Sequence, residues 1–293
     1  MLRQRVITAI VLLLVMALCL WLPAAWPFLA LLAVACGCAA WEWLRLTVPP
    51  AWGKILPVVG GVVVFGICAM WTADWTADQS GFGRGESVAW LGNLVYLSAV
   101  IWVLGAVAVV VQGDAQPRST GSLAWTAFAP IALLSAWAAL AIMYLQFSAW
   151  FVISLLITVW VADVAAYFAG RAIGKRKLAP RVSPGKTVAG AVAGVLCAVL
   201  WLVGSGLLSA GSFGAQLIAY WSLGGAIVIA ALLGALSIVG DLFESLLKRR
   251  AGSKDSSQLL PGHGGVYDRI DAILPVAVCG QALLMLGAAW GVA

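Results

Sequence analysis

The chain has 293 residues, of which 63% are hydrophobic and only 10% charged, and its mean hydropathy is +1.04. A soluble domain carries about 25% charged residues, so this composition excludes soluble enzyme folds, disordered chains and disulfide scaffolds, and it indicates a protein embedded in a lipid bilayer. The 17 Lys and Arg against 11 Asp and Glu indicate cytoplasmic loops and contact with anionic lipid or phosphate, and no nucleic-acid partner is predicted.

About nine stretches reach the roughly 20 apolar residues that a helix needs to cross a bilayer. We therefore predict an all-α, polytopic membrane protein. The first stretch has a long apolar run and is followed by further spans, so we interpret it as an uncleaved helix and not as a secretory signal. In chain order the predicted spans lie at 6–22, 27–44, 55–71, 88–111, 122–144, 149–170, 187–209, 215–240 and 271–291.

The charges between these spans predict the orientation of the chain. The segment 171–186 carries six basic residues and no acid, whereas 72–87 carries three acids and one base. Basic loops stay on the cytoplasmic side, which predicts a cytoplasmic N-terminus and a C-terminus outside. The predicted inside loops are about 45–54, 112–121, 171–186 and 241–270.

The charged residues gather in the second half of the sequence. The segments 160–186 and 241–271 together hold 11 of the 17 basic residues and six of the 11 acids, and both are predicted on the same side. We therefore predict a transmembrane scaffold at 1–150 and a catalytic region at 151–293.

The segment that follows the eighth span places polar side chains on one helical face. Asp241, Glu244, Ser245 and Lys248 are spaced i, i+3, i+4 and i+7, a spacing that aligns them along a helix. Taken alone, this stripe is also what a helix leaving the membrane presents to solvent.

A glycine-rich stretch with two further acids comes next. Gly262, Gly264 and Gly265 allow backbone N–H groups to approach an anion, and Asp268 and Asp271 follow at the mouth of the last span. Carboxylates beside such a loop and beside Lys and Arg are what a magnesium–triphosphate site requires.

Two single residues leave alternatives open. Asp163 lies inside the sixth span, where an ionisable residue indicates function by default, although it could simply pair with Arg171 or Lys175. The only histidine, His263, could be a general acid–base or a metal ligand. Since no second histidine or thiolate is near it, we favour hydrogen bonding to a phosphate or to its own loop.

A polar turn at 183–187 is predicted to open the seventh span, and a helix N-terminus is a favourable place for a phosphate. On the same predicted helix, Gly190 and Gly194 form a GxxxG pair. This pair predicts close helix packing rather than chemistry.

The segment 245–271 resembles the signature of the phosphatidate cytidylyltransferases, also called CDP-diglyceride synthetases. Asp163 with Tyr167 and Gly170 is similar to an upstream motif of that family, and so is the turn at 183–187, in the family's order. The family usually has an acidic or amide residue where this chain has Ala189. The matching residues are Ser245-x-Leu247-Lys248-Arg249-x4-Lys254-Asp255-x-Ser257-x2-Leu260-Pro261-x-His263-Gly264-Gly265-Val266-x-Asp268-Arg269-Ile270-Asp271.

This resemblance implies that CTP and phosphatidate are converted into CDP-diacylglycerol and pyrophosphate, with Mg²⁺, at the cytoplasmic face of the cytoplasmic membrane. It implies catalytic roles for Asp241, Lys248, Asp268 and Asp271, of which the three aspartates would hold the metal. A homodimer stays open as an assembly. The residues implied to contact the substrates are Asp163, Ser183, Lys186, Thr187, Ser245, Arg249, Lys254, Asp255, His263, Gly264, Gly265 and Arg269.

Two other classes of protein share some of these features. A CTP-using polyprenol kinase has a similar topology but transfers the γ-phosphoryl group, and the complete signature argues against it. A transporter would explain the spans and Asp163. It would not explain why acids, bases and glycines gather on one side of the membrane.

Overall fold

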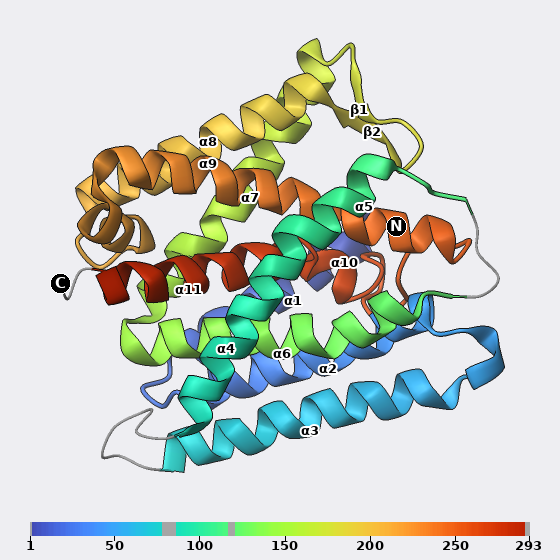
Figure 1. Ribbon diagram of the computed structural model, residues 1–293, viewed down its shortest axis with the longest axis horizontal. Coiled ribbons are helices and arrows are strands. Elements are labelled where there is room, and N and C mark those ends of the chain that lie inside the picture. The colour runs from blue at the N-terminus through green and yellow to red at the C-terminus, as the bar shows by residue number, and fades with distance from the viewer. Residues whose placement is uncertain (1, 78–85, 117–120, 291–293) are drawn as a thin grey trace.

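The computed structural model describes residues 2–77, 86–116 and 121–290, and it is built almost entirely of helices (Figure 1). The prediction of an all-α membrane protein is confirmed, with one short β-hairpin added. The elements are α1 (Leu2–Trp21), α2 (Trp26–Thr47), a 3₁₀ turn (Pro50–Trp52), α3 (Ile55–Ala77), α4 (Glu86–Val100), a π-helical segment (Ile101–Ala106), α5 (Val107–Gln112), α6 (Leu123–Gln146), α7 (Ala149–Ile173), β1 (Lys177–Ala179), β2 (Ser183–Thr187), α8 (Val188–Leu208), α9 (Phe213–Arg250), α10 (Tyr267–Ile270) and α11 (Ile273–Trp290).

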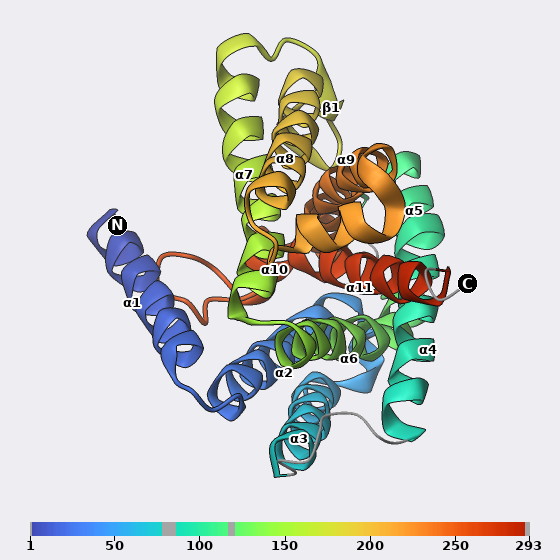
Figure 2. The same ribbon diagram turned by 90° about the vertical axis from the view of Figure 1, so that its left-hand side faces the viewer.

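Eight helices within the described ranges are long and apolar enough to cross a membrane, and α4 continues through the π-helical segment into α5 as one of them. The predicted first span forms α1, but its apolar part, Ile7–Trp21, is shorter than the other spans. Figure 2 shows α1 standing apart from the rest of the bundle. The protein is therefore a multi-pass membrane protein whose described residues contain eight candidate spans and one further apolar helix.

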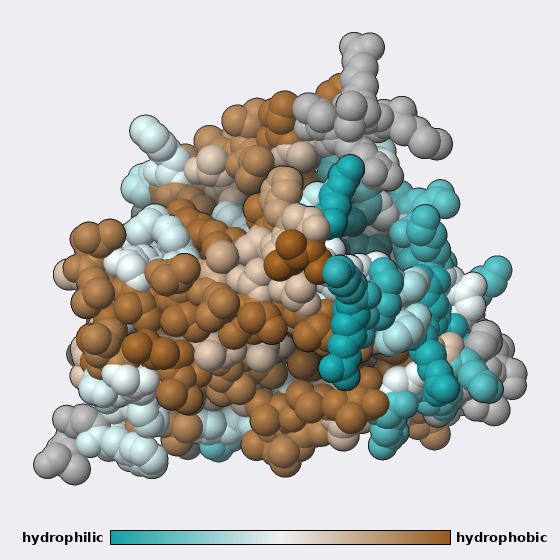
Figure 3. All heavy atoms as spheres, turned by 90° about the horizontal axis from the view of Figure 1, so that it is seen from above, coloured by the Kyte–Doolittle hydropathy of each residue, from teal (hydrophilic) through white to brown (hydrophobic). Residues whose placement is uncertain are grey.

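Successive long helices run in opposite directions. The C-terminal ends of α2, α5, α7 and α9 therefore lie at the same end of the bundle (Figure 1). The most hydrophilic residues gather at this end, whereas the rest of the visible face is mostly apolar, with scattered weakly polar patches (Figure 3). We call it the polar end. The predicted loops at 72–87 and 112–121 lie partly outside the described residues, and the membrane side that the polar end faces stays a prediction.

The longest helix, α9, continues ten residues beyond the predicted span end at 240. Its last three turns are amphipathic: Leu242, Phe243, Leu246 and Leu247 are buried, whereas the polar residues between them lie on the opposite stripe. Packing of the apolar stripe keeps this segment helical outside the apolar span. The predicted polar stripe is therefore held on a rigid helix.

The predicted loop at 171–186 contains more regular structure than expected. β1 and β2 pair as an antiparallel hairpin, with Lys177 opposite Thr187. The residues predicted to form a polar turn at 183–187 therefore form a strand, although they lead directly into α8 as predicted. Val182 in the hairpin is buried and packs with Leu242 and Leu246 of α9. This apolar contact fixes the hairpin on α9, and the short segment gives too little periodicity to reveal it in the sequence.

The GxxxG prediction for α8 is confirmed as helix packing. A Cβ atom added at Gly190 would lie 2.6 Å from the carbonyl oxygen of Ala166, and one at Gly194 would lie 2.9 Å from that of Ala162. The missing side chains therefore let α8 pack directly on the backbone of α7. At the start of α8 the Thr187 hydroxyl caps the helix by accepting a hydrogen bond from Gly190 N at 3.1 Å.

Candidate active site

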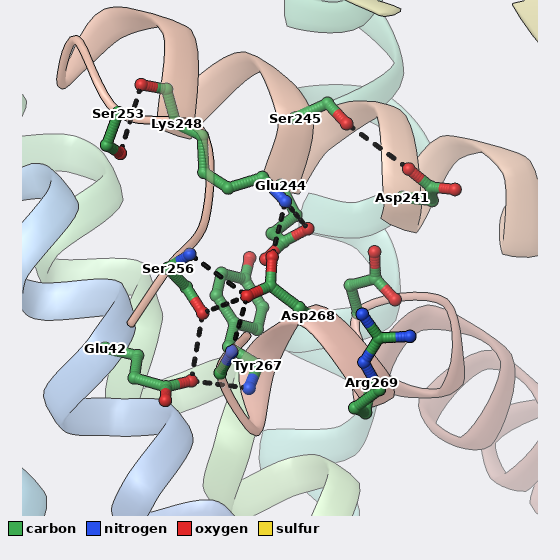
Figure 4. Close-up of polar contacts among 12 residues, drawn as sticks. Glu42, Asp241, Glu244, Ser245, Lys248, Ser253, Ser256, Tyr267, Asp268 and Arg269 are labelled. Carbon is green, nitrogen blue, oxygen red and sulfur yellow. Dashed lines mark hydrogen bonds and ion pairs between the residues drawn. The ribbon is translucent and has the colours of Figure 1, made fainter. Parts of the chain in front are cut away.

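Lys248 connects α9 to the glycine-rich segment at the polar end (Figure 4). Its Nζ lies 2.7 Å from Glu244 Oε2, one turn earlier on α9, and 2.5 Å from Asp268 Oδ1 on α10. Glu244 is almost fully buried, so Lys248 supplies a charged hydrogen-bond donor to a carboxyl group that has little access to water. The i, i+4 spacing of Glu244 and Lys248 in the sequence thus brings their side chains into contact on α9.

Asp268 uses its second oxygen to hold the glycine-rich segment. Oδ2 accepts hydrogen bonds from Gly265 N at 2.7 Å, from Ser256 Oγ at 2.8 Å and from Ser256 N at 3.0 Å. Burial acts to raise the pKa of Asp268, but hydrogen bonding with Glu244, Lys248 and Gly265 N, together with the Lys248 charge, outweighs it, so the pKa lies well below its usual range. Asp268 is therefore ionised at neutral pH.

A second ion pair joins the hairpin to α9. Lys186 Nζ on β2 lies 2.7 Å from Asp241 Oδ2, and Ser245 Oγ donates to Asp241 Oδ1 at 3.3 Å. Asp163 on α7 lies close enough to interact electrostatically with both Asp241 and Lys186. Three separate segments that the sequence singled out thus meet at the polar end.

The alternative pairing of Asp163 with Arg171 receives no support from the described contacts. Arg171 donates instead to the hydroxyl of Tyr167, one turn earlier on α7, at 3.2 Å. The side chain of Asp163 is exposed at the surface of α7. It therefore presents a carboxylate beside the Lys186–Asp241 pair rather than closing a local ion pair.

Asp271 is buried between α10 and α11, where its Oδ1 accepts a hydrogen bond from Ala272 N at 2.8 Å. Burial, together with the nearby charge of Asp241, raises the pKa of Asp271 to about 7. Two carboxylates that repel each other across a short distance favour a cation between them.

These acids have the chemistry of a magnesium site. Mg²⁺ prefers hard oxygen ligands and is usually bound through one or two carboxylates together with substrate phosphates. Across the ranges that the structure describes, no three acidic, imidazole or thiol side chains converge tightly enough to form a complete metal cage. Asp241 and Asp271 interact electrostatically, and Asp268 Oδ1 pairs with Lys248. A carboxylate oxygen has two lone pairs, so Asp268 could also contribute.

The remaining signature residues have different environments. Arg249 donates to the carbonyl of Val182 in the hairpin at 3.4 Å, and Arg269 donates to the carbonyl of His263 at 2.7 Å. The Arg269 contact fixes the turn around His263 from one side. Exposed Lys254 and Asp255 line a cavity of about 560 Å³ on the side of the segment that faces α2.

Two of the three predicted loop glycines, Gly264 and Gly265, are required by close contacts. Gly264 has a φ of +86°, and a Cβ there would lie 2.9 Å from Asp268 Oδ2. At Gly265 a Cβ would lie 2.6 Å from both carboxylate oxygens of Glu42. Their absent side chains let two carboxylates approach the backbone. Of the other predicted residues, Ser183 starts β2 and Thr187 ends it as the cap of α8.

One residue of this site was missed in the sequence. Glu42 of α2 is fully buried, and it accepts hydrogen bonds from Ser256 Oγ, Ser257 Oγ, Val266 N and Tyr267 N. The signal was present, because Glu42 lies within an apolar predicted span, where an ionisable residue indicates function. Its partners lie more than 200 residues away in the sequence, so no local pattern connects them.

Comparison with known proteins decides the family. A model of the cytidylyltransferase family matches residues 3–286, which is nearly the whole chain. The chain belongs to the cytidylyltransferase family. It is 36% identical over 293 residues to a phosphatidate cytidylyltransferase of Pseudomonas aeruginosa, with 99% of each chain covered.

Shorter matches concern other bacterial proteins with the same name. A phosphatidate cytidylyltransferase of Haemophilus influenzae is 47% identical over 117 residues, which cover 40% of this chain and 39% of that protein. One from Helicobacter pylori is 41% identical over 149 residues, which cover 50% and 52%. The family membership implied by the signature at 245–271 is therefore confirmed.

Proposed function

We propose that this protein is a membrane-embedded phosphatidate cytidylyltransferase, which converts CTP and phosphatidate into CDP-diacylglycerol and pyrophosphate. One observation carries the proposal beyond family membership. The signature residues from α7, β2, α9 and α10 meet at the polar end of a membrane-spanning bundle, through the pairs Lys186–Asp241 and Lys248–Asp268. A soluble nucleotide and a membrane lipid can both reach such a place.

The reaction matches the side chains that are present. A phosphate-monoester oxygen of phosphatidate attacks the α-phosphorus of CTP, a new P–O–P bond forms, and the bond to the departing pyrophosphate breaks. The second pKa of a phosphate monoester is about 6, so the attacking oxygen is already ionised at neutral pH and needs no catalytic base. The protein must instead orient and neutralise several anions, and Lys186, Lys248 and Arg269 supply fixed cations for this.

Mg²⁺ is the expected metal, held by Asp241 and Asp271 with a contribution from Asp268. When bound, it would neutralise charge on the triphosphate. Lys186 and Lys248 already pair with two of these acids, so the same lysines are placed to contact phosphate oxygens when substrates bind. The carboxylates then orient the cations as well as the metal.

The proposed location is the cytoplasmic membrane, with the polar end facing the cytoplasm. CTP is a cytoplasmic metabolite, and the hairpin segment 171–186 carries six basic residues without an acid, as cytoplasmic loops do. The oligomeric state stays open, with a homodimer as one alternative.

The test uses purified protein in mixed micelles with CTP, Mg²⁺ and phosphatidate. We expect one pyrophosphate for each CDP-diacylglycerol, and neither product when diacylglycerol replaces phosphatidate, because diacylglycerol lacks the attacking phosphate. A kinase would instead phosphorylate the diacylglycerol and release CDP. A transporter would release neither product, and either of these results would contradict the proposal.

A further inference from the structure

Glu42 is a buried carboxylate that accepts hydrogen bonds from four neutral donors in the segment 256–267. Val266 N donates at 3.0 Å and Tyr267 N at 2.6 Å, and the hydroxyls of Ser256 and Ser257 supply the other two hydrogen bonds. Burying a charge is costly unless it is fully hydrogen-bonded. The segment 256–267 must therefore stay folded against α2 for Glu42 to remain satisfied.

The same segment is shared with Asp268. Ser256 Oγ lies between the two acids, 3.1 Å from Glu42 Oε2 and 2.8 Å from Asp268 Oδ2 (Figure 4). Three consecutive amides divide between the same pair: Gly265 N donates to Asp268, whereas Val266 N and Tyr267 N donate to Glu42. A shift of Glu42 would therefore move the backbone that fixes Asp268.

A ring contact supports the same arrangement. Trp43, the neighbour of Glu42 on α2, stacks on the ring of Tyr267, with centroids 5.0 Å apart and ring planes 18° from parallel. Both rings are fully buried. Successive residues of α2 thus hold the start of α10 through its backbone and through its side chain.

We infer that Glu42 is a positioning residue of the active site: acting through Ser256 and the amides of Val266 and Tyr267, it sets the place of Asp268 relative to Lys248. The inference rests on the proposed function for its effect on turnover. Its structural part, that Glu42 holds the segment 256–267, can be tested without any reaction.

The main variant is Glu42→Gln, which keeps the shape but turns one acceptor into a donor that faces other donors. We expect kcat to fall about 100-fold, the cost of displacing a reacting group by roughly 1 Å, with KM for CTP changed by less than about threefold. Amide hydrogen exchange at 256–267 should become faster. Glu42→Asp keeps the charge but is too short to reach all the donors, so it should also lower kcat and speed amide exchange at 256–267. It serves as the test variant if Glu42→Gln does not insert into the membrane.

Two matched controls separate positioning from general destabilisation. Ser257→Ala removes a donor to Glu42 that does not contact Asp268, so its loss of kcat should be several times smaller. Ser135→Ala removes a buried hydroxyl that bonds only to Leu94 O and Ile131 O in the described contacts. It should leave both kcat and the exchange at 256–267 unchanged.

A double-mutant cycle with Ser256→Ala tests the proposed route. If Glu42 acts through Ser256, the double variant should lose little more kcat than the worse single variant, whereas independent effects would multiply. Multiplying losses, or wild-type kcat together with wild-type exchange in Glu42→Gln, would overturn the inference. A wild-type protein that makes no CDP-diacylglycerol would overturn the proposed function instead, and the exchange measurement would still decide whether Glu42 holds the segment.

Discussion

At the scale of single residues, the site is organised by shared partners. Lys248 contacts both Glu244 and Asp268. Asp268 in turn pairs with Lys248 and accepts a hydrogen bond from the backbone of the glycine-rich segment. A residue with two partners cannot be exchanged without disturbing both, so the effects of single substitutions should differ sharply with the role of each group.

The first prediction contrasts Asp268 with Lys248. Asp268→Asn should abolish turnover at every Mg²⁺ concentration, because an amide cannot both pair with Lys248 and accept the amide of Gly265 as an anion. Lys248→Gln should lower kcat by about 10²–10³, the usual cost of losing one preorganised charge. Steady-state rates over a Mg²⁺ titration measure both. Near-normal turnover of Asp268→Asn would show that this acid is not needed.

The second prediction concerns protons and Mg²⁺ at Asp271. Because burial and the charge of Asp241 raise the pKa of Asp271 to about 7, this acid is largely protonated below that pH and must lose a proton when a cation binds. The Mg²⁺ dissociation constant should therefore rise as the pH falls from about 8 to about 6, by up to about tenfold per unit. Calorimetry in the absence of substrates measures this, and an affinity independent of pH would contradict the role of Asp271.

At the scale of elements, the sequence predicts the helices well and their connections less well. Apolar runs of about 20 residues identify spans because the bilayer sets their length, and the GxxxG pair in α8 correctly predicts helix packing. The hairpin β1–β2 is stabilised by burial of Val182 against α9, and Glu42 meets its partners only when α2 and α10 come together. Such contacts depend on tertiary structure, and no local pattern encodes them.

The third prediction tests the packing of α8 on α7. Gly190→Leu should separate the two helices, since even a Cβ there would lie 2.6 Å from Ala166 O, and Asp163 on α7 would move away from Lys186. We expect lower thermal stability and a loss of most activity. The control is Gly204→Leu on the same helix, where a Cβ has nothing within 4 Å. Equal effects of the two variants would contradict the packing argument.

At the scale of the whole molecule, the bundle separates an apolar body from one polar end that holds the site. The predicted division into a scaffold at 1–150 and a catalytic region at 151–293 stays a prediction. Glu42 and Trp43 show how the first part can support the second, since both contact the start of α10. Catalysis at a single end also requires that the loops of this end share one side of the membrane.

The fourth prediction is that the loops at the polar end all face the same side of the membrane. Cysteines introduced at exposed Lys175 and Gln258, at the polar end, should resist a membrane-impermeant maleimide added outside intact cells and react after permeabilisation. A cysteine at exposed Ala210, in the turn between α8 and α9, should react from outside. Labelling of Lys175→Cys and Gln258→Cys on different sides would contradict a common site.

The central claim is transfer of a cytidylyl group to a lipid phosphate, and the fate of the individual CTP phosphates tests it most directly. Purified protein is incubated with phosphatidate and CTP that carries a radioactive phosphorus at either the α or the γ position, alongside Asp241→Asn as the inactive control. The account predicts that α-label enters the lipid, that γ-label appears only in pyrophosphate, and that the control transfers neither. Label from the γ position in the lipid, or no labelled lipid from either, would contradict it.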